Sequence, residues 1–482
     1  MERSSGILFV HPLGYSQEKA GKDVSRMANI MPPLGLISMA AMMDLHKISS
    51  HVIDCYCHPD SQTLIMDYIK DNSPGFIGFS CTTSSFLDGI RIAELVKAKH
   101  PDIKAVFGGP HVSALGASLM ELYDTIDYLV IGEGEVTLTE LVSAREKDIC
   151  EISGLVYRDA GNLVKFTGFR KKLLNLDTLP FPAYSKLAGY PDAYKLPIFN
   201  YPKTPNASCI SSRGCPYACS YCDRSVFRRT FRYNSAEYLF AHLDYLNKEF
   251  GIRHINFYDD QFTFHRARVD AFCRMMIRKN LKMTFNCAAR AEHLDYDLLK
   301  LMNAAGCWMI SLGVETGDPD LLAQHRQNPD LNMLREKIIL IRKAGIRVKA
   351  LLMMGLPGET ESSVKKSKEY VFGLPINDFN LAKFTPFPGS PIYEKIKAPG
   401  SKLGRFDENW EKMDCMEFLF VPERMTRERL DALFIDFYKS HFQRPSVMAS
   451  YLAMVWKSPD SWRRMLKNLP GFINFARRNR RI

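Results

Sequence analysis

The 482-residue sequence lacks any long hydrophobic segment. No stretch approaches the ~20 consecutive apolar residues that span a membrane. The most apolar run, residues 31–43, is short and contains two prolines. The first residues, Met-Glu-Arg-Ser-Ser, also lack the charged-then-apolar pattern of a secretion signal. We therefore expect a cytoplasmic protein.

Apolar and charged residues are present in the proportions of a globular protein, 46% and 24% respectively. A chain of 482 residues is too long for one ordinary hydrophobic core, so we expect two or three domains. The twelve cysteines are mostly scattered singly or in pairs, which is typical of reduced thiols in a cytosol.

Acidic residues are scarce at the C-terminal end of the chain. From Lys457 onward, Asp460 is the only acidic residue among many lysines and arginines. Much of the net charge of +11 therefore belongs to a basic tail. This distribution argues against a basic groove along the whole protein, though not against nucleic acid at the tail. The C-terminal segment shows no obvious RNA-binding module, so we expect no nucleic-acid partner.

Residues 1–143 alternate short apolar strands with helices, which is the pattern of a doubly wound parallel sheet. Strands are expected at 7–10, 50–54, 76–80, 104–107 and 128–131, and helices at 34–46 and 86–100. Such sheets bind ligands at the carboxyl ends of their strands. Here these ends are rich in small residues, and glycine lets a backbone approach a large planar ligand closely. The residues are Ser80, Thr82, Thr83, Gly108, Gly109, Gly132 and Gly134.

Residues 144–206 are predicted to form a connector with one hairpin, at 155–158 and 163–166. The central segment, 207–400, again repeats strand and helix, which fits an open partial (β/α)6 barrel. Sites in barrels lie at the carboxyl ends of the strands, where the polar clusters of this segment also fall. The last segment, 401–482, is predicted to be helical. The six barrel strands are expected at 208–211, 254–258, 284–288, 308–313, 348–354 and 380–384.

The stretch from Arg213 to Cys222 carries three cysteines, with three and then two residues between them. An odd number of thiols cannot all pair as disulfides, and three is one ligand short of a closed tetrahedral zinc site. On an iron–sulfur cube, three protein ligands leave one iron open to a substrate or cofactor. Two simpler alternatives are a zinc knuckle completed by a distant His or Cys, and three buried thiols. The predicted metal ligands are Cys215, Cys219 and Cys222.

This spacing resembles the signature of the radical S-adenosylmethionine (SAM) superfamily. The resemblance implies a 4Fe–4S cluster whose fourth iron is chelated by the amino and carboxylate groups of SAM. One electron then cleaves the sulfonium, and the resulting 5′-deoxyadenosyl radical removes hydrogen from an unactivated carbon.

The same resemblance implies roles for residues of the cysteine loop and for residues that follow the barrel strands. Asp260 is favoured over Asp259 as the partner of the methionine ammonium, because a carboxylate suits an ammonium. The simpler alternatives are a solvated loop acid or helix cap for Asp259 and a surface ion pair for Arg290. The other predicted contacts are Tyr221 with adenine, Glu315 with the ribose hydroxyls, Arg290 with the methionine carboxylate, and Gly355 and Gly358 beside adenine.

Three motifs precede the cysteines: Pro-Pro-Leu-Gly-Leu from residue 32, Gly-Gly-Pro-His from 108 and Gly-Glu-Gly-Glu from 132. Together they look like the cobalamin-binding domain of cobalamin-dependent radical SAM enzymes. The Asp-x-His-x-x-Gly motif of other cobalamin proteins is missing, so we expect no histidine ligand to cobalt. His11 and His111 are interpreted as hydrogen-bonded loop histidines. The residues predicted to contact cobalamin are Ser80, Thr82, Gly108, Gly109, Gly132 and Gly134.

The C-terminal segment looks like that of the anaerobic magnesium-protoporphyrin monomethyl ester cyclase group and of its hopanoid-associated relatives. This resemblance implies a small, hydrophobic or lipid-like substrate, an electron donor such as flavodoxin or ferredoxin, and either methylation or oxidative cyclisation. A basic amphipathic end with tryptophans also suits the surface of a membrane. The alternative is a packing helix over the barrel mouth with a solvated basic tail. The apolar residues are Trp456, Trp462, Leu466, Leu469, Phe472, Ile473 and Phe475.

Two other functions fit parts of the pattern. A radical SAM enzyme of the methylthiotransferase type, which modifies RNA, would carry further cysteines in its N-terminal domain for a second cluster. The cysteines before the barrel lack such spacing. A zinc-stapled binding protein without catalysis is the other alternative. Uptake of iron and cobalamin would distinguish among the three.

Overall fold

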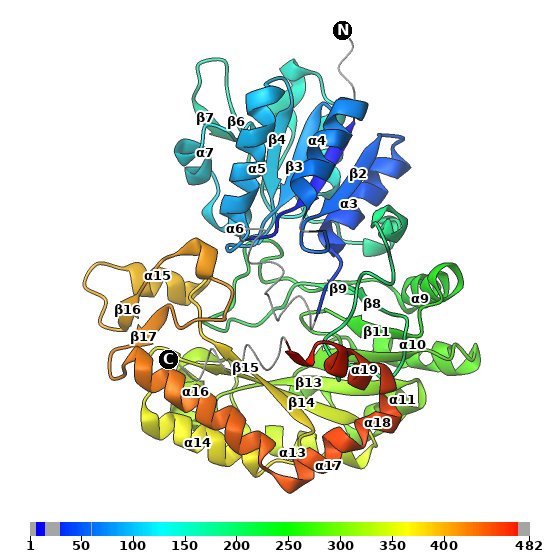
Figure 1. The fold of residues 1–482 in the computed structure, drawn as a ribbon, viewed down its shortest axis with the longest axis vertical. Coiled ribbons are helices and arrows are strands. Elements are labelled where there is room, and N and C mark those ends of the chain that lie inside the picture. Colours follow the sequence, from blue (N-terminus) through cyan, green and yellow to red (C-terminus); the bar gives the residue numbers. More distant parts are fainter. Residues whose placement is uncertain (1–5, 15–28, 59, 471–482) are drawn as a thin grey trace.

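The computed structural model describes residues 6–14, 29–58 and 60–470, and it contains two parallel sheets, one above the other in Figure 1. The N-terminal sheet forms the upper part. An open half-barrel forms the lower part, and the C-terminal helices wrap around it. The predicted α/β class and its three-part architecture are confirmed. Phe472, Ile473, Phe475 and the last arginines lie outside the described residues.

The N-terminal sheet has the order β2-β1-β3-β4-β5-β6-β7. Its first five strands are parallel, and the last two form an antiparallel hairpin at the edge. The hairpin of the predicted connector therefore belongs to this sheet. The strand order reverses between β1 and β3, which opens a crevice at their carboxyl ends. The strands are β1 (Ile7–His11), β2 (Ser50–Asp54), β3 (Phe76–Ser80), β4 (Lys104–Gly108), β5 (Tyr128–Val130), β6 (Leu155–Arg158) and β7 (Val164–Phe166).

Both faces of this sheet are buried, which explains its continuous apolar strands. Ile7 and Phe9 pack on one face with α3 (Leu34–Leu45) and α8 (Gly134–Ser143). Leu8 and Val10 pack on the other face with the remaining helices. The core on the α3 side continues into the half-barrel, so the two sheets share hydrophobic contacts. The helices of the second face are α4 (Ser61–Asn72), α5 (Phe86–Lys99), α6 (Pro110–Leu115) and α7 (Ser118–Leu122).

The half-barrel has six parallel strands in the order β15-β14-β13-β12-β11-β8, which confirms the six predicted units. Alternate residues of β14 (Arg347–Met354) are buried, as expected for a strand that is covered by helices on one face. The other strands are β8 (Asn206–Cys209), β11 (His254–Phe257), β12 (Thr284–Ala289), β13 (Cys307–Glu315) and β15 (Asp378–Lys383). The helices are α9 (Ala236–Phe250), α10 (Arg266–Arg278), α11 (Tyr296–Ala304), α12 (Pro319–His325), α13 (Leu331–Lys343) and α14 (Glu361–Phe372).

The C-terminal segment covers the open edge of the half-barrel. Tyr438 of α16 (Arg427–Phe442) accepts the backbone N–H of Leu381, so the edge strand β15 is not left unpaired there. Farther along, Arg464 donates to the carbonyl of Leu196 and anchors the last described helix. No helix among residues 6–14, 29–58 and 60–470 is long and apolar enough to cross a membrane. The remaining elements are α15 (Pro391–Lys397), β16 (Gly404–Phe406), β17 (Phe420–Pro422), α17 (Pro445–Leu452), α18 (Met454–Lys457) and α19 (Pro459–Lys467).

Candidate functional site

The carboxyl ends of the N-terminal strands face the cysteine loop across a cavity of about 420 Å³. The upper wall comes from the carboxyl ends of β3, β4 and β5 and from the residues after β4 and β5, and the lower wall includes residues between 210 and 228 and Asp260. Apolar side chains such as Phe9, Met39 and Val130 line its interior. Sequence positions that are more than 100 residues apart therefore meet at one site.

The cysteine loop follows a short antiparallel pairing of β9 (Ser212–Arg213) with β10 (Arg232–Tyr233). Gly214 has φ +84°, and a Cβ atom there would lie 2.3 Å from the carbonyl oxygen of Thr230. Only glycine fits this position, because any side chain would collide with the backbone. The tight turn presents Cys215 and Cys222 to the cavity, and both line it.

All three loop thiols are free of disulfides. Cys222 opens onto the cavity, yet the surrounding protein raises the pKa of its thiol to about 12, with smaller contributions from Asp260, Cys215 and Cys219. In the described part of the chain, no three His, Cys, Asp or Glu side chains already converge on one metal ion. Three thiols are one ligand short of a closed tetrahedral zinc site, whereas on an iron–sulfur cube they leave one iron open. The donor set therefore fits the cluster.

The two consecutive aspartates after β11 have different surroundings. Asp259 is buried and accepts hydrogen bonds from the backbone N–H of Ser211 at 2.6 Å and from the hydroxyls of Ser211 and Ser212 at 2.6 and 2.8 Å. Asp260 faces the cavity and accepts the N–H of Gly214. Burial and the neighbouring Asp259 raise the pKa of Asp260. Asp259 therefore holds the approach to the cysteine loop, and Asp260 is the one available to a cationic ligand.

A buried ion-pair network joins the two sheets at the cavity wall. Arg213, directly before the cysteine loop, donates to Glu133 and Glu135 at 2.6 Å each. Arg232 pairs with the other oxygen of Glu133 at 2.7 Å. Burial opposes ionisation of Glu135, but Arg213 outweighs it and lowers the pKa of Glu135. Since the two glutamates alternate with Gly132 and Gly134, this Arg213 clamp fixes the glycine edge relative to the cysteines.

Glu315 ends β13 in an unusual backbone conformation, with φ +64° at a register shift of the sheet. Its carboxyl hydrogen bonds with the hydroxyl of Tyr221, and burial raises the pKa of Glu315. A residue other than glycine rarely adopts this conformation, and it persists only where its surroundings enforce it.

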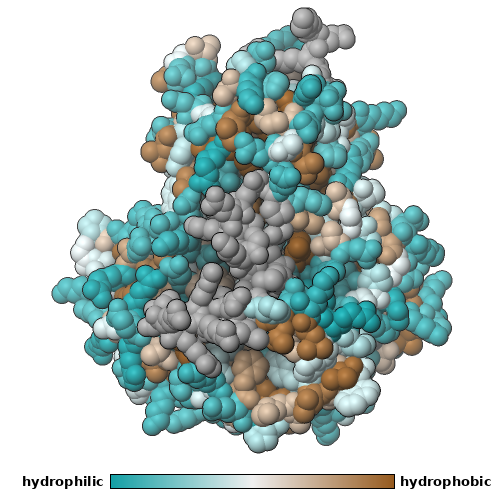
Figure 2. Space-filling view, in the orientation of Figure 1, coloured by the Kyte–Doolittle hydropathy of each residue, from teal (hydrophilic) through white to brown (hydrophobic). Residues whose placement is uncertain are grey.

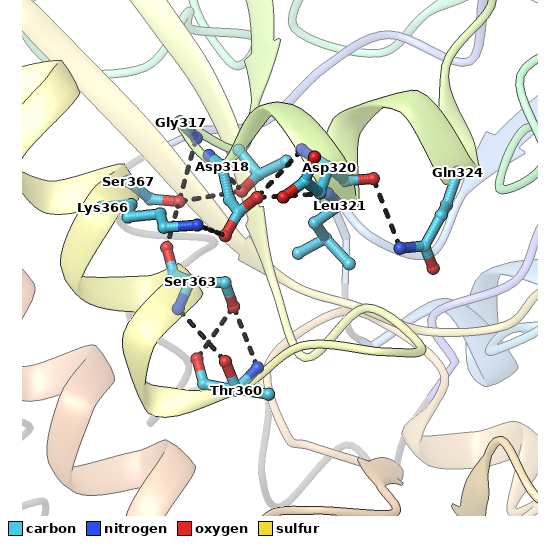
Figure 3. A network of polar contacts seen from close by, with 10 residues as sticks. Gly317, Asp318, Asp320, Leu321, Gln324, Thr360, Ser363, Lys366 and Ser367 are labelled. Atoms are coloured by element: carbon cyan, nitrogen blue, oxygen red, sulfur yellow. Dashed lines mark hydrogen bonds and ion pairs between the residues drawn. The ribbon is translucent and has the colours of Figure 1, made fainter.

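The segment after Glu315 is held by the polar network of Figure 3. The hydroxyl of Ser367 accepts the N–H of Gly317 at 2.9 Å, and Lys366 pairs with Asp318 at 2.9 Å. Thr360 and Ser363 cap the start of α14 in the same view. The network thus ties the end of β13 to α14 and supports the position of Glu315.

The Gly355–Gly358 turn also has positive φ at both glycines, +95° and +86°. The buried carboxyl of Glu359 accepts the backbone N–H of Gly355. Burial raises the pKa of Glu359 to about 8. His325 links this turn to the cysteine loop, since its ring contacts the carbonyl of Pro357 at 2.8 Å and the hydroxyl of Ser220 at 2.9 Å.

Arg290 lies beside the cysteine loop rather than on the surface. Its guanidinium carbon is 3.7 Å from the centre of the Tyr217 ring, and Nη1 lies 3.9 Å from Sγ of Cys219. Nη2 donates to the carbonyl of Gln327 at 2.8 Å, and Nε donates to Glu292. The structure thus brings Arg290 to Cys219, while Tyr221, Glu315 and the glycine turn gather on the neighbouring side of the loop.

The glycine edge of the N-terminal sheet fits a large planar group. Ser80, Gly108, Gly109, Gly132 and Gly134 all line the cavity. At Gly109, with φ +99°, a Cβ atom would lie 2.7 Å from the carbonyl oxygen of Cys81, so no side chain can narrow the site there.

Several residues named from the sequence do not line this cavity. Cys219, Tyr221, Arg290, Glu315, Gly355 and Gly358 lie outside its lining, and so do Thr82, His11 and His111. Thr82 does not line it, and its hydroxyl bonds with Ser84 and Ser85. His11 pairs with Asp54 at 2.8 Å, and His111 contacts Thr83 at 3.2 Å. Both histidines are hydrogen-bonded, as the sequence predicted, but neither lies in a loop, because His11 ends β1 and His111 lies in the first turn of α6.

Sequence reasoning missed Arg213, His325 and Glu359, and it assigned no role to Glu133 or Glu135. Arg213 directly precedes the glycine and cysteine of the loop, and both glutamates alternate with cavity glycines. These neighbouring residues were the signal from which a role for Arg213 and the two glutamates could have been predicted. Nothing local to the sequence indicates that they pair with one another.

Comparisons with known proteins agree with this geometry. A profile of the B12 binding domain matches residues 23–142, and a profile of the radical SAM superfamily matches residues 209–371. An uncharacterised methyltransferase of Pyrococcus horikoshii is 28% identical over 86% of this chain and 89% of its own length. The anaerobic magnesium-protoporphyrin IX monomethyl ester cyclase of Rubrivivax gelatinosus is 24% identical over 91% of this chain and 77% of its own.

Among solved structures, the cobalamin-dependent SAM radical enzyme OxsB, with aqua-cobalamin and SAM bound, has a similar fold. Its TM-score is 0.65 at 19% identity, with 82% of this chain covered. This chain spans 55% of that structure. The similarity extends over both sheets, which supports their shared arrangement.

Proposed function

We propose the reaction of this chain from its radical SAM domain, matched over residues 209–371, and from the B12 binding domain that precedes it, matched over residues 23–142. The protein methylates, or oxidatively modifies or cyclises, an unactivated carbon of a small and hydrophobic substrate. Its domains imply three cofactors: a 4Fe–4S cluster, SAM and cobalamin. When bound, they supply one-electron cleavage of a sulfonium and a methyl or electron carrier.

The cavity shared by the glycine edge and the cysteine loop is the observation that carries this proposal. Cys215, Cys219 and Cys222 would hold the cluster, and three ligands leave one iron for SAM. Ser80 and the four cavity glycines would hold cobalamin on the opposite wall. A substrate carbon between these walls could meet both cofactors.

Four side chains would orient SAM around the loop. Asp260 offers a carboxylate to the methionine ammonium, because it is the acid that faces the cavity. Glu315 and Tyr221 offer polar groups for the ribose and adenine, and the Gly355–Gly358 turn leaves room beside the base. Arg290 is already engaged by Gln327 and Glu292, so its role is to place positive charge next to Cys219 and the SAM carboxylate.

Anaerobic reconstitution tests the proposal. We expect about four irons and four sulfides per chain, tight cobalamin uptake, and cleavage of SAM under reduction. Cys222→Ala should abolish SAM cleavage, whereas Cys150→Ala, an exposed cysteine outside the loop, should not. Uptake of zinc without iron or sulfide, or retained cleavage in Cys222→Ala, would refute the cluster assignment. Reduced flavodoxin or ferredoxin is the proposed electron donor.

The C-terminal helices support a hydrophobic substrate and contact with a membrane surface as further parts of the proposal. Figure 2 shows hydrophobic residues on the lower right of the molecule, where Figure 1 places α17 and α18. Trp456 is 82% exposed, and Met448, Leu452 and Leu466 are more than half exposed. Basic residues lie between them along the sequence, so the surface combines the two features that bind an anionic lipid interface.

A further inference from the structure

A second cavity, of about 470 Å³, adjoins the cofactor cavity. The two share Gly132, Leu179, Val226 and Arg228 in their walls, together with the Arg213 clamp. The remaining wall comes from residues 169–174, which cross from the β6–β7 hairpin toward the half-barrel. A molecule in this second cavity would therefore lie next to the site of the proposed reaction.

The lining of the second cavity has an excess of positive charge. Its two carboxylates, Glu133 and Glu135, are both engaged by Arg213. Arg170 is engaged by Glu140, which lies outside the lining. Three cations remain, and among the described residues none of them forms an ion pair with a carboxylate. They are Lys171, Lys172 and Arg228.

The direct contacts of Lys172 and Arg228 are with neutral groups. The ammonium of Lys172 donates to the carbonyl of Phe227 and to the hydroxyl of Thr230 at 2.9 Å, both neutral groups. Burial and the nearby Arg232 and Arg228 lower the pKa of Lys172 and outweigh the opposing effect of Glu133. The guanidinium carbon of Arg228 lies 3.5 Å from the centre of the Phe169 ring. Lys172 is half-buried, whereas Lys171 and Arg228 are exposed at the cavity wall. Neighbouring like charges of this kind favour a bound anion.

The same wall also carries exposed apolar side chains. Leu174 is 83% exposed and Phe169 is 60% exposed, and both line the cavity with Leu173. Apolar side chains beside a few placed polar groups are typical of sites for small organic molecules. The wall thus suits a molecule with an apolar body and an acidic group.

We propose that the second cavity is a subsite for an organic anion, a carboxylate or phosphate carried by a larger apolar molecule. This inference rests on the proposed function, since the bound molecule would extend into the cavity where the proposed reaction takes place. The anion has two sources with the same chemistry: the substrate itself, or the phosphodiester in the nucleotide tail of cobalamin. Lys171, Lys172 and Arg228 would bind it, and Phe169 and Leu174 would contact the apolar part.

A pair of fluorescent probes tests the subsite in the full-length reconstituted protein. Pyrenebutyrate carries a carboxylate, and pyrenebutanol has the same ring system without charge. In Lys171→Gln/Arg228→Gln we expect the affinity for pyrenebutyrate to fall at least tenfold and the affinity for pyrenebutanol to change less than twofold. Arg229→Gln, an exposed arginine outside both cavities, is the matched control and should leave both affinities unchanged.

Cobalamin and cobinamide, which lacks the nucleotide tail, identify the source of the anion. Weaker binding of cobalamin alone in the double variant would assign the subsite to the cofactor phosphodiester. Unchanged binding of both corrinoids, together with the loss of pyrenebutyrate affinity, would assign it to the substrate. Equal losses for the charged and uncharged probes, or no loss for any ligand, would overturn the proposal. Probe binding needs no turnover, so failure of the subsite is distinguishable from failure to bind iron or cobalamin.

Discussion

Replacing Arg213 with methionine removes the charge of the Arg213 clamp and keeps a side chain of similar length. Glu133 would still pair with Arg232, but Glu135 would retain only neutral partners, the hydroxyl of Ser38 at 3.1 Å and its own backbone N–H. Arg213 is 15% exposed and Glu135 is 9% exposed, so the variant leaves a carboxylate nearly buried without a cation. Breaking a buried pair in this way costs about 3–5 kcal/mol, and we expect about 3 kcal/mol because the site retains some solvent contact.

Thermal unfolding under anaerobic conditions measures this loss. At 2–4 °C per kcal/mol, typical of domains of this size, about 3 kcal/mol lowers the melting temperature by roughly 6–12 °C. Arg91→Met is the control, because Arg91 also joins distant segments through a 2.7 Å pair with Glu411, but both side chains are 47% exposed. Exposed pairs contribute at most about 1 kcal/mol, so this control should melt within about 4 °C of the wild type.

The pH dependence gives the loss a signature. In the wild type the pKa of Glu135 is lowered, so its contribution to stability is present above its ordinary pKa and is lost only as the pH falls through the folded value. In Arg213→Met the buried, unpaired carboxyl of Glu135 should have a raised pKa. The free energy of unfolding should therefore fall as the pH rises above the ordinary pKa of a glutamate. The difference between the two proteins should therefore widen from pH 5 to pH 8. A constant difference, or a loss no larger than that of Arg91→Met, would contradict the reasoning.

Three other variants test separate parts of the structure. Gly214→Ala should lose its iron, because the added Cβ would lie 2.3 Å from the carbonyl oxygen of Thr230. Gly251→Ala is the control, since Gly251 also has a positive φ but has open space around it, and this variant should keep its iron. Equal iron contents per chain in the two variants would refute the role of the Gly214 turn. Glu359→Gln should flatten the pH dependence of the melting temperature between about pH 5 and 8. The raised pKa of Glu359, about 8, makes the wild type lose stability as the pH rises through that window. An unchanged pH profile would count against a buried neutral carboxyl. Trp456→Ser should weaken sedimentation with anionic vesicles without changing the melting temperature. Leu122→Ser, which replaces an exposed apolar residue on α7, is the control and should sediment like the wild type. If the wild type does not bind the vesicles, the proposed membrane contact is wrong.

The strands of both sheets could be predicted from the sequence because their signals are local. An apolar run such as 7–10, ended by a polar or small residue, specifies a buried strand wherever it occurs. The carboxyl ends of parallel strands must lie at the same edge of a sheet, so the polar clusters after the barrel strands could be assigned to one site. The three cysteines were predictable for the same reason, since the chemistry of an open iron depends on their spacing along ten residues.

The sequence alone left the choice between Asp259 and Asp260 to analogy. The structure distinguishes them by their partners, since Ser211 and Ser212 occupy the oxygens of Asp259 while Asp260 faces the cavity. Thr82 shows the opposite outcome: it follows a strand like the other small residues, but local hydrogen bonds with Ser84 and Ser85 keep it from the cavity.

The local sequence pattern therefore determined the helices and strands, which part of the chain forms each sheet, and the position of the cysteine loop in the sequence. Tertiary structure alone decided that Arg213 pairs with glutamates about 80 positions earlier and that the glycine edge faces Cys215 and Cys222. It also decided that three cations outside any described ion pair line one cavity. The physical reason is the separation along the chain over which each interaction acts. Strand and turn preferences act between neighbours in the chain, whereas ion pairs and shared cavities depend on how two separately folded sheets pack together.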